Sequence, residues 1–169
     1  MSDEFSSLLD LLPMLVTSAR TGVLMALLVL AAVLDVKTGR IPNWLVFGGI
    51  VYALAYNAFS PVYPRDIGIL FALAGLAVGL LAFLPLYLLR AMGAGDVKLM
   101  ALVGAFIGST AAIASVLATL LAGGVLAAML ALRSRRLTGV KMPYGVAIAV
   151  GTIGYLLAAQ LGYLPYAWS

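Results

Sequence analysis

The sequence predicts an all-α fold: a polytopic membrane bundle of about six transmembrane helices. Of its 169 residues, 64% are hydrophobic and only 9% are charged, whereas an average soluble domain has roughly 25% charged residues. A water-soluble domain of this size cannot bury so much apolar surface, and the mean hydropathy is +1.16. Lipid is therefore the expected solvent, and residues 1–169 are expected to form a single membrane-embedded domain.

Two missing residue types limit the chemistry. The chain has no cysteine and no histidine. Disulfides and thiolate metal sites are therefore excluded, and the usual zinc ligands and the usual general base are missing. We expect no metal and no cofactor.

The first three predicted helices are read from stretches without charged residues, because a transmembrane helix needs about 20 apolar residues. A short interfacial segment over 5–16 is expected to precede the first span, Thr21–Leu34, which extends back to about Thr17. The second and third spans are predicted over Ile41–Ser60 and Ile67–Leu89.

The next uncharged stretch, Leu99–Leu132, is too long for one span and short for two full ones. Gly108-Ser109-Thr110 inside it is a natural turn. We therefore expect a short helix over about Asp96–Ile107 and a fuller one over Ala111–Leu132. The last span is predicted from about Pro143 to Leu161, which completes the six.

Basic residues set the expected orientation. Eight of the ten follow the first, third and fifth spans, on one side of the bundle: Lys37, Arg40, Arg90, Lys98, Arg133, Arg135, Arg136 and Lys141. On the other side, Arg65 lies next to Asp66, and Arg20 is expected to snorkel from a helix end. By the positive-inside rule the basic loops are cytoplasmic and both termini are outside. Charges spread over three short loops do not form the basic face that a nucleic acid needs, so no nucleic-acid partner is expected.

Two of the six acidic residues call for an explanation. The other four lie before the first span or in an outer loop: Asp3, Glu4, Asp10 and Asp66. Asp35 ends the first span and Asp96 opens the fourth helix, both at the cytoplasmic interface. Acidic residues at membrane depth are costly and mark functional sites. The simpler alternative for each is an interfacial aspartate paired with a nearby lysine.

Glycines precede Asp96 in the string Met92-Gly93-Ala94-Gly95-Asp96. Glycine permits close approach by another chain, so an extended peptide lying along this loop meets little obstruction. The alternative is a loop that uses glycine only to turn. After Asp35, Pro42 suits the first turn of a helix and Asn43 suits helix capping, which leaves Asp35 itself unexplained.

These motifs together resemble a known family. Asp35-x-Lys37, Ile41-Pro42-Asn43 and Gly93-x-Gly95-Asp96-x-Lys98 resemble the motifs of the type IV prepilin peptidases, membrane aspartyl proteases of the Gly-x-Gly-Asp type. The resemblance extends from the first span to Pro143-Tyr144-Gly145. It implies that Asp35 and Asp96 are the catalytic pair. It also implies supporting or substrate-binding roles for Lys37, Pro42, Asn43, Gly93, Gly95 and Lys98.

The resemblance further implies an endopeptidase at the cytoplasmic face of the bacterial inner membrane. Its substrate is a prepilin or pseudopilin, whose basic leader is removed by cleavage after a glycine. Long members of the family carry an additional amino-terminal region with a cysteine-bearing domain that N-methylates the trimmed pilin. This chain resembles the short form of tight-adherence (Flp-type) pilus systems, so peptidase activity without methyltransferase activity is expected.

Two other classes of protein remain as alternatives. In a small transporter, Asp35 and Asp96 would bind a cation or relay protons, but such sites need polar groups near the bilayer midplane. A non-catalytic component of a pilus or secretion machine needs no paired aspartates. Presenilin-like proteases also use Gly-x-Gly-Asp, but the Pro-Ala-Leu element that they carry is missing from this sequence. The paired motifs favour the prepilin peptidase.

Overall fold

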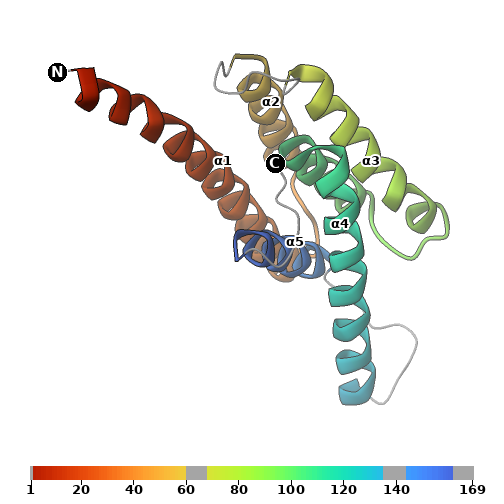
Figure 1. Cartoon of the computed structure of the whole chain (residues 1–169). Helices are drawn as coiled ribbons and strands as arrows, with labels where there is room; N and C mark the ends of the chain where they lie inside the picture. Colours follow the sequence, from red (N-terminus) through yellow and green to blue (C-terminus); the bar gives the residue numbers. More distant parts are fainter. Residues whose placement is uncertain (1, 60–67, 135–143, 162–169) are drawn as a thin grey trace.

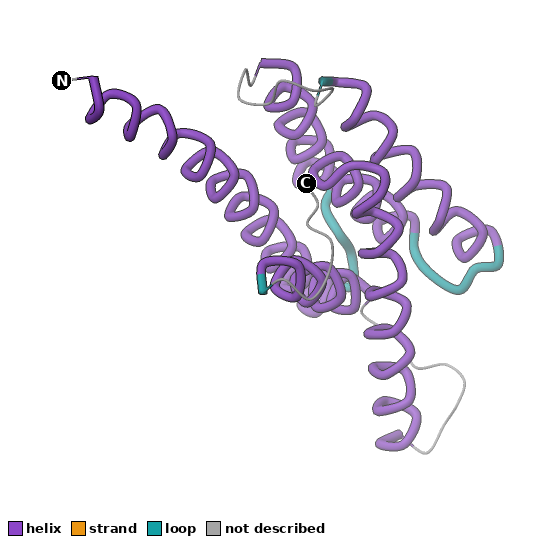
Figure 2. Tube along the Cα trace, in the orientation of Figure 1, coloured by secondary structure: helices purple, strands orange, loops and turns teal. Residues whose placement is uncertain are grey.

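A computed structural model describes residues 2–59, 68–134 and 144–161, and these residues form five α-helices. In chain order they are α1 (Ser2–Thr38), α2 (Asn43–Phe59), α3 (Ile69–Leu88), α4 (Ala94–Ser134) and α5 (Tyr144–Gln160). The all-α prediction is therefore confirmed for the described residues. Figure 2 shows the two described loops between helices, residues 39–42 and 89–93, which join α1 to α2 and α3 to α4.

Three of the described helices are long and apolar enough to cross a membrane. These spans are Ala19–Thr38 in α1, Ile69–Leu88 in α3 and Ala94–Leu130 in α4. The protein is accordingly a multi-pass helical membrane protein. The basic residues Arg65, Arg135, Arg136 and Lys141, which contribute to the predicted orientation, lie outside the described residues together with Asp66.

Helix α1 is continuous from Ser2 to Thr38 (Figure 1). No turn separates residues 5–16 from the first span, so the expected interfacial segment is the start of the same helix. The buried residues of α1 recur at Leu24, Leu28, Ala31 and Asp35. This spacing places them on one face of the helix, so Asp35 points into the bundle rather than to its surface.

Helix α4 is broken at Gly108, whose φ of 78° and ψ of 175° are not helical. Essentially only glycine adopts this backbone conformation. The predicted division of Leu99–Leu132 at this glycine is therefore confirmed. Every residue from Leu99 to Gly108 is buried, which makes the first half of α4 the centre of the bundle.

Helix α3 packs closely against this central half-helix. A Cβ added to Gly75 would overlap the carbonyl oxygen of Gly104, and one added to Gly104 would overlap that of Gly75. The two backbones are thus in direct contact, as small residues allow between membrane helices. This backbone contact at Gly75 and Gly104 fixes the position of the half-helix that begins just before Asp96.

Arg20 is buried, which corrects the expectation that it snorkels to the interface. Its side chain is 2% exposed. It donates a hydrogen bond to the carbonyl of Phe106 and lies 5.4 Å from the ring centroid of Tyr56 on α2. Carbonyls before a helix break lose their helical partners and need others. Arg20 supplies such a partner for the Phe106 carbonyl and so joins α1 to the broken end of the half-helix.

Helix α5 connects parts of the bundle that otherwise barely meet. It packs against both α1 and α4, whereas α1 and α4 make little direct contact with each other. In Figure 1, α5 crosses α1 near the end of α1 that leads to α2. The end of α1 that bears Asp35 is therefore held mainly through α5.

The backbone contact between α3 and α4 predicts that one added methyl group destabilises the protein. Gly104→Ala should lower the free energy of unfolding by about 1–3 kcal/mol, because the methyl group must push two backbones apart. Thermal unfolding in detergent measures this. Gly48→Ala on α2 is the control, since a Cβ there meets nothing within 4 Å. Equal midpoints of thermal unfolding for the two variants would contradict the backbone contact between α3 and α4.

Candidate functional site

The two aspartates predicted to be functional line one pocket. Asp35 is 9% exposed and Asp96 is 8% exposed. The pocket has a volume of about 370 Å³, and its other lining residues come from the loops next to the two aspartates and from the first turns of α2 and α4: Gly39, Arg40, Ile41, Asn43, Gly93, Ala94, Gly95 and Lys98. Residues far apart in the sequence thus form one polar cavity.

Asp96 is held at the start of α4 by its own loop. Its Oδ2 accepts a hydrogen bond from the backbone N–H of Gly93 at 2.9 Å, and its own N–H donates to the carbonyl of Gly93 at 3.2 Å. Gly93 is the residue before the helix, and Asp96 is the third residue inside it. A side chain at this position that bonds back to the capping residue is half of a capping box. The glycine motif therefore orients the carboxylate.

The Asp35 carboxylate is held by the start of α5, a different helix from its own. Its Oδ2 accepts a hydrogen bond from the backbone N–H of Gly145 at 2.9 Å. Gly145 is the second residue of α5, and the first N–H groups of a helix have no partner within it. A carboxylate is favoured there by the helix dipole. Each aspartate is thus anchored through one oxygen, and the other oxygen of each has no hydrogen-bond partner among the described residues.

Gly145 is a site residue that the motifs did not identify. A Cβ at this position would lie 2.9 Å from Oδ2 and 3.0 Å from Cβ of Asp35. Only glycine therefore lets α5 approach Asp35 this closely. The available signal was a glycine next to Pro143 and Tyr144 at the predicted start of the last helix, but nothing local to it indicates a contact with Asp35.

The loop after Asp35 turns sharply at Gly39, whose φ is 63°. The N–H of Gly39 donates to the carbonyl of Asp35 at 2.7 Å, as expected for a glycine that ends a helix in a left-handed conformation. The chain then passes the start of α4, where a Cβ on Gly95 would lie 3.2 Å from the Cβ of Ile41. Gly95 thus lets the two loops meet.

Lys98 and Asn43 connect the two motifs. Lys98 Nζ donates a hydrogen bond to Asn43 Oδ1 at 3.2 Å and lies 5.5 Å from the ring centroid of Phe47. Asn43 is the first residue of α2, so this bond joins the start of α2 to the first turns of α4.

The remaining predicted supporting residues differ in position. Gly93 and Gly95 line the pocket, whereas Lys37 and Pro42 do not. Lys37 is exposed in the last turn of α1. Pro42 is half-buried and directly precedes α2, rather than lying within its first turn. Arg40, which was not among the predicted site residues, lines the pocket and adds a positive charge to it.

Fold and pocket together define a class: a multi-pass helical membrane protein with two buried carboxylates at helix ends. A family model described as the type IV leader peptidase family matches residues 22–132, a range that contains both Asp35 and Asp96. The chain belongs to the type IV leader peptidase family.

One curated relative and the solved structures complete the comparison. The chain is 30% identical over 131 residues to the prepilin leader peptidase/N-methyltransferase of Bacillus subtilis (strain 168). The alignment covers 78% of this chain and 52% of that protein, so the chain spans about half the length of the relative. No solved structure matches the chain.

The contact between Asp35 and Gly145 predicts a coupled effect on stability. Gly145→Ala should lower the free energy of unfolding by about 1–3 kcal/mol, because its methyl group displaces the Asp35 carboxylate. The cost should shrink in an Asp35→Ala background, where that carboxylate is gone. Thermal unfolding of the four proteins tests this. Gly154→Ala on the same helix is the control, since a Cβ there meets nothing within 4 Å, and strictly additive effects would contradict the contact.

Proposed function

We propose that this chain is an aspartyl endopeptidase that removes the leader peptide from prepilins or pseudopilins. The observation that carries the proposal is the placement of Asp35 and Asp96 in one pocket of a type IV leader peptidase family member. Family membership supports the class of substrate, and the paired carboxylates supply the chemistry. Peptidase activity without N-methyltransferase activity is part of the proposal.

In the proposed reaction one aspartate acts as an ionised general base and the other as a protonated general acid. The ionised aspartate takes a proton from a water molecule as the water oxygen attacks the carbonyl carbon of the cleaved peptide bond. The protonated aspartate donates a hydrogen bond to the carbonyl oxygen. When the C–N bond breaks, a carboxyl group delivers a proton to the leaving amine.

The anchoring of each aspartate suits the roles of general base and general acid. One oxygen of each carboxylate is bound to a backbone N–H, which restrains the side chain. The other oxygen is left for the water or for the substrate carbonyl. An extended substrate would lie along the loops around Gly39 and Gly93, where both backbones border the pocket.

The proposed orientation puts this pocket at the cytoplasmic face of the inner membrane. Lys37, Arg40 and Lys98 cluster at the same ends of α1 and α4 as the aspartates, which agrees with the positive-inside rule. With α4 counted as two segments on either side of Gly108, the bundle would cross the membrane six times, with both termini outside. Residues 1–169 would then form one catalytic domain.

Both aspartates should be essential. Asp35→Asn and Asp96→Asn should each reduce leader cleavage by about 10²- to 10⁴-fold, because an amide can neither take a proton from water nor deliver one to the leaving amine. The assay co-expresses a prepilin and follows the shift in its mass. Membrane insertion and thermal stability of each variant are measured in parallel. Cleavage at the parental rate by either variant would refute the proposal.

The two lysines should differ in importance. Lys98→Met should lower kcat/KM by about 2- to 10-fold, because it removes the hydrogen bond that joins α4 to α2 beside the pocket. Lys37→Met should have a smaller effect, confined to KM, because an exposed Lys37 acts only by meeting substrate. A larger loss for Lys37→Met than for Lys98→Met would reverse these assignments.

A further inference from the structure

The carboxylate of Asp35 is positioned by α5, and α5 in turn packs against α4. The N–H of Gly145, in the first turn of α5, binds Asp35, whereas α1 and α4 make little direct contact with each other. The relation between Asp35 and Asp96 therefore depends on where α5 lies along α4. A contact that fixes this placement also fixes the geometry of the two-aspartate pocket.

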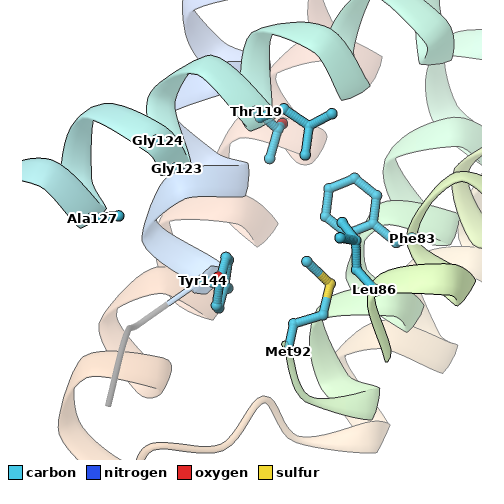
Figure 3. Close-up of a pocket in the computed structure, with 9 residues that line it drawn as sticks. Phe83, Leu86, Met92, Thr119, Gly123, Gly124, Ala127 and Tyr144 are labelled. Atoms are coloured by element: carbon cyan, nitrogen blue, oxygen red, sulfur yellow. The ribbon is translucent and has the colours of Figure 1, made fainter. Parts of the chain in front are cut away.

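Close packing does not hold the first turn of α5 on every side. An apolar pocket of about 170 Å³ borders Tyr144, the first residue of α5, and Thr119 of α4 also lines it. Figure 3 shows Tyr144 on one side of this pocket and Phe83 of α3 on the other. Side chains beside a void lack the contacts that resist a small displacement. The start of α5 therefore needs a further restraint to keep Gly145 against its partner.

Small residues bring α5 against the second half of α4. A Cβ added to Gly151 would lie 2.5 Å from Cα of Thr119, so the two backbones touch there. A Cβ added to Gly123 would make an ordinary contact, at 3.6 Å, with the Cβ of Ala147. Small residues allow this close approach between membrane helices. They also leave few interlocking side chains at this crossing to stop α5 from sliding along α4.

One buried hydrogen bond lies beside this backbone contact. Oγ of Ser115 on α4 and Oγ1 of Thr152 on α5 are 2.9 Å apart, and both residues are fully buried. Neither hydroxyl has another hydrogen-bond partner among the described residues. A hydrogen bond tolerates only a narrow range of distances and angles. This one therefore restrains both the rotation of α5 and its position along α4.

The hydrogen bond to α4 and the hydrogen bond to Asp35 are made from the same region of α5. Thr152 follows Gly145 by seven residues, which is about two helical turns or about 10 Å along the axis. Rigid secondary elements carry displacements from one site to another. A shift of α5 at Thr152 therefore moves the N–H of Gly145 as well. A displacement of about 1 Å caused by a remote substitution can slow catalysis by about 100-fold.

We propose that Ser115 and Thr152 are positioning residues: their hydrogen bond sets the register of α5 on α4 and so aligns Asp35 with Asp96. The inference rests on the proposed peptidase function and adds to it a determinant of rate outside the pocket, because neither residue lines the pocket of the two aspartates. Since neither hydroxyl meets substrate, the bond acts on the chemical step and leaves substrate binding unchanged.

The hydrogen bond can be removed without leaving a buried hydroxyl unpaired. Thr152→Val alone leaves Ser115 without a partner and should lower the unfolding temperature. The double variant Ser115→Ala/Thr152→Val replaces both groups by apolar ones and should unfold close to the wild-type temperature. With a prepilin substrate, both variants should show kcat reduced about 10- to 100-fold and KM within about 2-fold of the wild-type value. Thr152→Ser keeps the hydroxyl and should keep most of the parental kcat.

Thr119→Val is the matched control. Thr119 is buried one helical turn from Ser115, and its Oγ1 has no hydrogen-bond partner among the residues that the structure describes. This variant should keep the parental kcat. The positioning role is overturned if the double variant recovers kcat together with stability, if Thr152→Ser is as slow as Thr152→Val, if the loss lies in KM, or if Thr119→Val is equally slow.

Amide hydrogen exchange at Gly145, followed by NMR in detergent, tests the positioning without relying on cleavage. Asp35 Oδ2 accepts this N–H, so its exchange should be about 10-fold faster in Thr152→Val and in the double variant than in wild type or Thr119→Val. Unchanged exchange in both variants overturns the positioning role even where wild type cleaves prepilins. Faster exchange in both variants, with no prepilin cleaved by wild type, overturns the peptidase proposal alone.

Discussion

The burial of the first half of α4 is the constraint on which the rest of the structure depends. Backbone contact with α3 at Gly75 and Gly104 holds this segment in place, and the break at Gly108 ends it. In lipid, each carbonyl near such a break needs a partner from the protein. Arg20 binds one of them, which places a charge inside the bundle and joins α1 to the segment. Asp96 lies in the first turn of the same segment, so this packing determines its position.

The two carboxylates are anchored alike although they come from different helices. Each accepts a backbone N–H of a glycine at the start of a helix: Gly93 before α4 for Asp96, and Gly145 in α5 for Asp35. Helix starts suit carboxylates because their N–H groups are unpaired and their dipole end is positive. Since α1 and α4 touch little, the relation between the aspartates depends on α5. Movement of α5 would therefore alter the site directly.

The described residues form a polar pocket and an apolar pocket. The polar pocket is lined by the two aspartates with Arg40 and Lys98, and the apolar pocket is lined mainly by side chains of α3, α4 and α5. The basic residues beside the polar pocket agree with the proposed removal of a leader at the cytoplasmic membrane boundary.

The sequence by itself determined the helical membrane class, the break at Gly108 and the two aspartates as candidates. The first two inferences are confirmed, because they rest on composition and on local backbone preference. The aspartates stay a prediction, which rests on the cost of charge in lipid. Only the tertiary structure decided that Arg20 is buried, that Gly145 binds Asp35, and that Thr119 faces an apolar pocket. Asp35 and Gly145 are 110 positions apart. No local pattern encodes such a contact, because it depends on how α5 packs against α1.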